Sequence, residues 1–220
     1  MHELELRFSD ATDSPTEFNR IMSVTYSEML DLGTQAPSFD LPASNPDVNH
    51  NSGPRRSLED FAEAEVLVVV FTCNHCPYAK HVENALIRTV STYTERGVAF
   101  VAISSNDPDQ YSEDSFESMA RRAREKGYPF PYLFDEKQEV AQAYRAVCTP
   151  DFFVFDSERK LAYRGRFDET RPGRGEATGM DLITALDQLL ETGEVTIEQR
   201  PSMGCNIKWK PGNRPAQSLA

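Results

Sequence analysis

Two cysteines, Cys73 and Cys76, stand two residues apart directly after the apolar run Val66–Phe71. The run predicts a buried strand, and the apolar positions that recur at spacings of three and four after it predict a helix that begins at the cysteines. A cysteine at a helix N-terminus faces unpaired N–H groups and the positive end of the helix dipole, which stabilise the thiolate. Because the thiolate is the attacking species in disulfide exchange, this arrangement predicts thiol redox chemistry.

The spacing also assigns a role to each cysteine. We predict that Cys73 is the nucleophile and that Cys76, one helical turn later, resolves the mixed disulfide and leaves a Cys73–Cys76 disulfide. His75 directly precedes Cys76, and a cationic imidazole near Cys73 would further stabilise its thiolate. The sequence therefore predicts a Cys73 pKa below that of a free thiol.

Two other interpretations of the cysteine pair stay open. One is a zinc half-site, but structural zinc normally needs four ligands and the chain has no second C-x-x-C or H-x-x-x-H pair. His75, His81 and Cys205 could in principle be recruited as ligands. The other is a pair of inert core cysteines. We predict no bound metal and no cofactor.

The composition limits the class of protein. With 220 residues, of which 39% are hydrophobic, the chain suits one well-cored domain. The net charge of -12 disfavours nucleic acid as a partner. The apolar run Val66–Phe71 is too short to span a bilayer, so we expect no membrane partner. The first residues lack a secretory signal pattern, and a cytoplasmic location, where thiols stay reduced, is expected.

Periodicity along the chain predicts an α/β fold. Further strands are expected at 98–103, 152–155 and 161–166, the last two as antiparallel neighbours, with helices at 116–123, 140–144 and 182–190. Weaker patterns predict a short helix around Phe18, Ile21, Met22 and Tyr26, an extended piece at 36–42, a helical turn capped by Ser57 and an exposed loop at 167–179. Together they predict a mixed central sheet with helices on both faces. We expect an N-terminal extension at 1–32, one domain at 33–193 and a C-terminal segment at 194–220.

A second motif, Cys148-Thr149-Pro150-Asp151, directly precedes the strand at 152–155. A proline entering a strand is uncommon unless it fixes an unusual turn or isomer. With the C-x-x-C pair, it makes the chain resemble the thioredoxin-fold redoxins, in which a cis-proline beside the cysteines holds open a backbone edge for substrate. The resemblance implies that Pro150 is that cis-proline and that Thr149 contacts substrate; we also expect Asn74 and Pro77 to do so. An ordinary trans-proline is the alternative.

Within these redoxins, the chain is similar to an uncharacterised peroxiredoxin-like subgroup of the alkyl hydroperoxide reductase and thiol-specific antioxidant type. The resemblance covers about residues 33–190 and extends to a C-terminal motif. The matching motifs are Phe71-Thr72-Cys73-Asn74-His75-Cys76-Pro77, Cys148-Thr149-Pro150-Asp151 and Gly204-Cys205-Asn206-Ile207-Lys208-Trp209-Lys210. For such a subgroup the fold is better supported than the substrate.

Two departures from better-known relatives bear on the chemistry. Peroxiredoxins carry a P-x-x-x-T-x-x-C motif, yet the threonine position is Val70 before Cys73 and is Cys73 itself before Cys76. Thioredoxin has a buried acid six residues before its first cysteine, and here that position is Leu67. His75 is the nearest candidate in sequence for the missing proton acceptor.

The C-terminal segment holds a fourth cysteine, Cys205, close to Met203, Ile207 and the single tryptophan Trp209. Disordered tails rarely combine such residues, so we expect this segment to pack back on the domain and shield the active site. Cys205 then either approaches Cys148 or the C-x-x-C pair and relays oxidising equivalents, or is a buried inert cysteine.

The sequence thus favours a thiol-disulfide oxidoreductase that reduces protein or small-molecule disulfides and is itself reduced by an upstream thiol system. The alternative enzyme is an antioxidant thiol peroxidase, in which Cys73 becomes a sulfenic acid that condenses with Cys76 or Cys205. A third interpretation is a non-catalytic module, metal-loaded through Cys73, Cys76 and His75.

Overall fold

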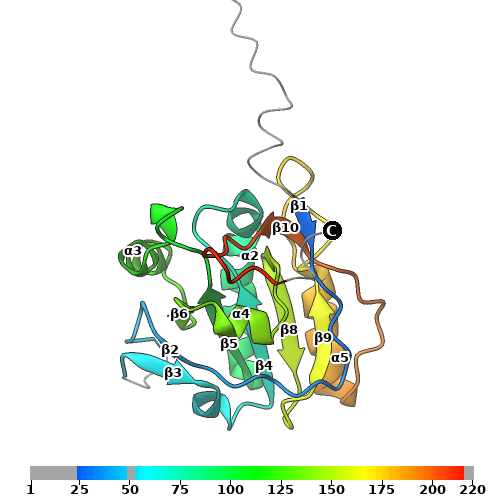
Figure 1. The fold of residues 1–220 in the computed structure, drawn as a ribbon. Helices are drawn as coiled ribbons and strands as arrows, with labels where there is room; N and C mark the ends of the chain where they lie inside the picture. Colours follow the sequence, from blue (N-terminus) through cyan, green and yellow to red (C-terminus); the bar gives the residue numbers. More distant parts are fainter. Residues whose placement is uncertain (1–23, 49–52, 216–220) are drawn as a thin grey trace, which may run out of the picture.

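The computed structural model describes residues 24–48 and 53–215 (Figure 1). Most of the helix predicted around residues 18–26 lies outside these residues. Its last member, Tyr26, belongs instead to strand β1 (Val24–Tyr26), so the helical prediction is wrong there. Among the described residues, no helix is long and apolar enough to cross a membrane.

A five-stranded sheet forms the centre of the domain, in the order β6-β5-β4-β8-β9 (Figure 1). Strand β4 (Val66–Phe71) is parallel to β5 (Val98–Ser104), which is parallel to β6 (Tyr132–Phe134). On the other side, β8 (Asp151–Phe155) is antiparallel both to β4 and to β9 (Leu161–Gly165). Every residue of β4 is buried. The predicted mixed sheet with a terminal antiparallel pair is confirmed.

Helices cover both faces of this sheet because side chains alternate along β4. Val66, Val68 and Val70 pack with α2 (Pro77–Tyr93), α3 (Phe116–Lys126) and α5 (Met180–Thr192). Leu67, Val69 and Phe71 face the opposite core, which includes α4 (Glu139–Ala143). Short 3-10 turns stand at η1 (Leu58–Phe61), η2 (Thr94–Arg96) and η3 (Ser112–Asp114). The turn at η1 has the predicted Ser57 as its N-cap.

Two small sheets complete the fold. The extended piece predicted at 36–42 contains β2 (Asp40–Pro42), which pairs with β3 (Arg55–Ser57). Beyond α5, the chain returns as β10 (Met203–Asn206), which lies between β1 and β7 (Cys148–Thr149) in antiparallel register (Figure 1). Ile207 is buried in the core, and Trp209 packs against it. The C-terminal segment therefore packs back on the domain as far as residue 215.

The loop at 167–179 is only partly exposed, in contrast to the prediction. Phe167, Asp168 and Gly179 are buried at its two ends. The carboxylate of Asp168 accepts hydrogen bonds from the backbone N–H groups of Thr170, Thr178 and Gly179, which closes the loop on itself. The glycine- and charge-rich composition of the loop gave no sign of these hydrogen bonds to Asp168.

Candidate active site

The cysteine pair lies in the turn between β4 and α2. Thr72 still donates its backbone N–H to Ile103 at 2.9 Å, so the strand geometry continues almost to Cys73. The helix begins at Pro77, which places Cys76 at the N-cap. Proline suits the first helical position because it lacks the N–H that would be unpaired there. The helix predicted to begin at the cysteines is confirmed, and its N-terminus serves Cys76 rather than Cys73.

The second motif lies against both sulfurs. The Thr149–Pro150 peptide bond is cis, as the resemblance implied. Cys73 Sγ lies 3.4 Å from Thr149 Oγ1, and Cys76 Sγ donates to the Thr149 carbonyl oxygen at 3.2 Å. Residues separated by more than 70 positions in sequence thus form one site.

The pKa values of the two cysteines are shifted in opposite directions, and the shift at Cys73 is the reverse of the one predicted. Burial raises the pKa of Cys73, and the neighbouring Cys76 sulfur and the Asp114 carboxylate raise it further. Burial also opposes ionisation of Cys76, but hydrogen bonds from the Cys205 and Cys73 thiols and from the Ala79 N–H outweigh it and lower the pKa of Cys76. The predicted low pKa of Cys73 is therefore wrong, and of the two thiols it is Cys76 whose pKa is lowered.

His75 is hydrogen-bonded to Asp114 rather than to Cys73. Its Nδ1 lies 2.5 Å from Oδ2 of Asp114, a carboxylate with no solvent exposure, and its ring stacks on Tyr111 at 4.2 Å. Asp114 also accepts hydrogen bonds from the Asn74 N–H at 2.7 Å and from the Asn106 amide at 2.8 Å. A negative carboxylate next to the imidazole offsets any positive charge that the ring carries.

Asp114 is a site residue that sequence reasoning missed. It lies in η3, about forty residues after the cysteines, within a run of ordinary polar residues, so only the folded chain brings it to the site. Asn74 was expected to contact substrate, but the nitrogen and the oxygen of its side-chain amide are both hydrogen-bonded within the protein. Its amide donates to the Glu113 carbonyl at 2.7 Å, and its oxygen accepts from the Tyr132 hydroxyl at 3.2 Å. Asn74 therefore ties the cysteine turn to η3.

The other two cysteines have different surroundings. Cys205 on β10 pairs in register with Thr149 and forms a buried cluster with Cys73, Cys76 and Ala79. The hydrogen bond to Cys76 and burial raise the pKa of Cys205. Cys148 is fully buried outside that cluster, and burial and the charge of Asp151 raise its pKa. All four thiols are free.

A buried acid lies on the neighbouring strand β8. Asp151 follows the cis-proline, pairs in register with Phe71 at the end of β4 and has no solvent exposure. Burial raises its pKa to about 7, although the Ser202 hydroxyl and the Arg164 guanidinium oppose the shift. Asp151 is thus a buried acid near Cys148, on the strand next to β4, rather than at the position of Leu67.

The described residues contain one set of donors with the spacing of a metal site: Cys73, His75 and Asp114, whose ligand atoms lie within 4.8 Å of one another. This set differs from the one that the sequence suggested, because Asp114 replaces Cys76. The oxygens of Asp114 already accept several hydrogen bonds from the protein. A metal ion would have to displace them, so the site suits proton exchange better than metal binding.

Comparisons with known proteins agree with the motifs. The profile of the AhpC/TSA family matches residues 32–164. The chain is 50% identical to an uncharacterized conserved protein from Geobacillus kaustophilus, with a TM-score of 0.81 over 87% of this chain and 98% of that one. It is 42% identical to a hypothetical protein from Sinorhizobium meliloti 1021, with a TM-score of 0.80 over 86% of this chain and 100% of that one.

A more distant structural likeness concerns the fold alone. The thioredoxin domain of a thiol-disulfide oxidoreductase from Bacteroides vulgatus is 18% identical, with a TM-score of 0.51 over 70% of this chain and 97% of that one. No curated protein sequence matches the chain. The predicted thioredoxin-like α/β fold is confirmed.

Proposed function

The chain belongs to the AhpC/TSA family, and we propose that it is a thiol-disulfide oxidoreductase acting through Cys73 and Cys76. Membership of this redoxin family indicates thiol oxidoreductase activity in general. The observation that carries the finer proposal is the contact of both sulfurs with Thr149, next to the cis-proline. One thiolate and two further thiols within a single buried cluster suit a two-electron exchange.

We assign attack to Cys76, the reverse of the order predicted from sequence, because the pKa is lowered at Cys76 and raised at Cys73. The Cys76 thiolate attacks a substrate disulfide and forms a mixed disulfide, and one half of the substrate leaves as a thiolate. Cys73 then loses its proton to the His75–Asp114 pair and attacks the Cys76 sulfur, which releases the second half. Two protein thiols are thereby oxidised and one substrate disulfide is reduced.

Cys205 is a second group able to resolve the mixed disulfide. Its thiol donates to the Cys76 sulfur from the opposite element, β10. In that case the product is a Cys76–Cys205 disulfide, and the electron balance is unchanged. We assign no redox role to Cys148, which lies outside the cluster. Reduction of either disulfide requires an upstream thiol reductant, and a reducing compartment such as the cytoplasm remains the proposed location.

Trapping with Ellman's reagent, which releases a coloured thiolate, tests this order. We expect Cys76→Ser to lose the rapid first release. The double variant Cys73→Ser with Cys205→Ser should keep the first release and accumulate a mixed disulfide, which intact-mass measurement detects. Cys148→Ser is the matched control and should react like the wild type. If Cys73→Ser loses the first release and Cys76→Ser keeps it, the order is that predicted from sequence. If no variant and no wild-type protein reacts, the proposal fails.

A second candidate, a thiol peroxidase, is favoured by one observation. Cys76 has no solvent exposure and is covered by Cys205 of β10, so a reagent as small as hydrogen peroxide reaches it more easily than a large disulfide. The Cys76 thiolate would attack one oxygen of hydrogen peroxide, which breaks the O–O bond, forms a sulfenic acid and releases hydroxide. A neighbouring thiol would then condense with the sulfenic acid to form a disulfide and release water. Stopped-flow mixing with hydrogen peroxide tests this. Stoichiometric oxidation within seconds that depends on Cys76 supports a peroxidase, whereas oxidation over many minutes rejects it.

A further inference from the structure

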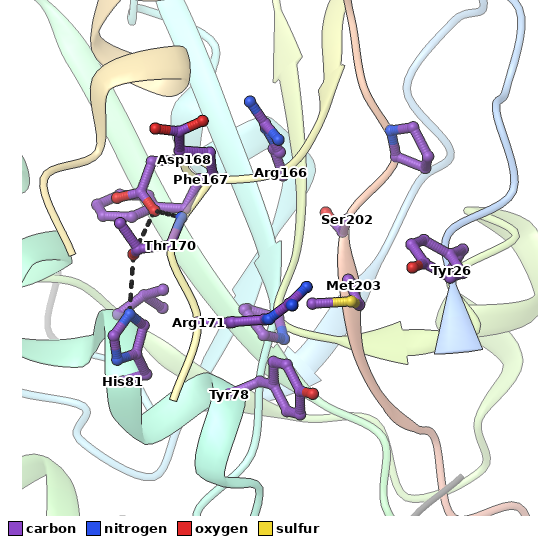
Figure 2. Close-up of a pocket in the computed structure, with 14 residues that line it drawn as sticks. Tyr26, Tyr78, His81, Arg166, Phe167, Asp168, Thr170, Arg171, Ser202 and Met203 are labelled. Atoms are coloured by element: carbon purple, nitrogen blue, oxygen red, sulfur yellow. Dashed lines mark hydrogen bonds between the residues drawn. The ribbon is translucent and has the colours of Figure 1, made fainter. Parts of the chain in front are cut away.

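A cavity of about 180 Å³ lies beside the cis-proline Pro150 (Figure 2). Its walls come from the first turn of α2, the loop after β9 and the segment that leads into β10. A hydrogen bond of 2.8 Å between His81 and Thr170 ties the loop to α2 and holds two of these walls together. The volume equals that of about six water molecules, enough for a short arm of a small molecule.

The cavity adjoins the thiol cluster. Tyr78 lines the cavity and also packs against the cluster of Cys73, Cys76 and Cys205. Met203 lines the cavity as well, and side chains two apart on a strand point to the same face, so Met203 and Cys205 share a face of β10. The cavity and the thiol cluster therefore share the Tyr78 side chain as a common wall.

The edge that a protein substrate would need is already covered. Strand β10 pairs with β7 in register, with Cys205 opposite Thr149. The approach is so close that a Cβ at Gly204 would lie 1.9 Å from the Thr149 carbonyl oxygen. No further strand can be added at this edge while β10 occupies it. The cavity on the Tyr78 side reaches Pro150, and its size suits a small substrate.

The charge in the cavity favours an anion. Arg171 lines it, and its side chain extends toward Tyr78 (Figure 2). Within residues 24–48 and 53–215, the Arg171 guanidinium has no hydrogen-bond or ion-pair partner, whereas Arg166 on the same wall is paired with Asp181 at 2.5 Å. Burial and the nearby Cys205 sulfur raise the pKa of Tyr78, and the positive charge of Arg171 opposes that shift. The α2 N-terminus adds the positive end of a helix dipole.

Two carboxylates also line the cavity, but neither neutralises this cation. The carboxylate of Asp168 is held by the loop's own N–H groups and by the hydroxyl of Thr170 (Figure 2). Glu169 is exposed to solvent. We propose that the cavity binds a small disulfide that carries a carboxylate, with the carboxylate on Arg171 and the Tyr78 hydroxyl. This inference rests on the proposed function and names its substrate class.

Three small disulfides of similar size but different charge test the inference. They are 3,3′-dithiodipropionate, a dianion, bis(2-hydroxyethyl) disulfide, which is neutral, and cystamine, a dication. Rates of thiol oxidation in the reduced full-length protein are measured at low ionic strength. We expect the dianion to react about tenfold faster than the neutral compound, and cystamine to react most slowly. The net charge of -12 favours cystamine in general, so the expected order requires a local cation.

The residue itself is tested by a matched pair of variants. Arg171→Gln should bring the ratio of dianion to neutral rates close to one. Arg174→Gln removes the same charge from an exposed residue of the same turn and should leave the ratio unchanged. Equal rates for the three disulfides in the wild type, or the same fall in ratio for both variants, would overturn the inference while the proposed function stands. No reaction with any of the three would overturn the proposed function itself.

Discussion

Replacing Gly204 by alanine should separate the C-terminal strand from the active site. A Cβ built at this residue lies 1.9 Å from the carbonyl oxygen of Thr149, 2.7 Å from its carbonyl carbon and 3.3 Å from the nitrogen of Pro150. All three atoms are backbone and cannot turn aside as a side chain could. Since real Cβ atoms do not approach closer than 3.0 Å, β10 has to withdraw from β7 by about 1 Å.

The cost follows from packing and from the strand ladder. Overpacking of a tight interior costs about 1–3 kcal/mol, and each weakened backbone hydrogen bond adds about 1 kcal/mol. We therefore expect Gly204→Ala to lower the free energy of unfolding by about 3 kcal/mol. The same movement withdraws the Cys205 thiol from Cys76. Because the hydrogen bond from that thiol lowers the pKa of Cys76 more than any other contact does, the pKa of Cys76 should rise.

Urea denaturation measures the first effect, and the pH dependence of alkylation at Cys76, followed by mass spectrometry, measures the second. Gly53→Ala is the matched control, because a Cβ there comes no closer than 3.6 Å to any atom and the backbone is not left-handed. The control should keep the wild-type stability and alkylation profile. The reasoning is refuted if Gly204→Ala unfolds like the wild type and leaves the pH dependence of alkylation at Cys76 unchanged.

Three further measurements probe the buried charges. The pKa of Asp151 is about 7 in the folded protein and close to 3.8 when unfolded, so the folded state holds a proton more tightly and loses stability as pH rises between these values. The stability of Asp151→Asn relative to wild type should therefore grow by up to about 4 kcal/mol from pH 4 to pH 8 in urea denaturation, and a difference independent of pH contradicts the assignment. Asp114→Asn removes a negative charge that raises the pKa of Cys73, so the alkylation midpoint of Cys73 should move to lower pH while that of Cys148 stays in place. Protein purified without chelators should contain far less than one zinc per chain by elemental analysis; stoichiometric zinc that Asp114→Asn abolishes would show that the Asp114 cluster is a metal site.

Much of the fold was readable because its causes are local. Six consecutive apolar residues in β4 are buried on both faces of a sheet, and apolar repeats at helical spacing mark α2 and α5. Pro150 was expected to be cis from its place before a strand and from the resemblance. Even the true start of α2 was present in the sequence, since Pro77 at the first helical position indicates Cys76 as the N-cap.

The chemistry of the cysteines depends on residues that arrive from elsewhere in the chain. Thr149 comes from β7 and Cys205 from β10, and the resemblance and the motifs brought both into consideration. Asp114 comes from η3, and no sequence pattern reveals its neighbours. The sequence by itself determined that two thiols stand at a strand-to-helix turn, and the resemblance implied a cis-proline beside them. Only the tertiary structure decided that the pKa is lowered at Cys76 and raised at Cys73, because the pKa of a buried thiol depends on the donors and charges within a few ångströms.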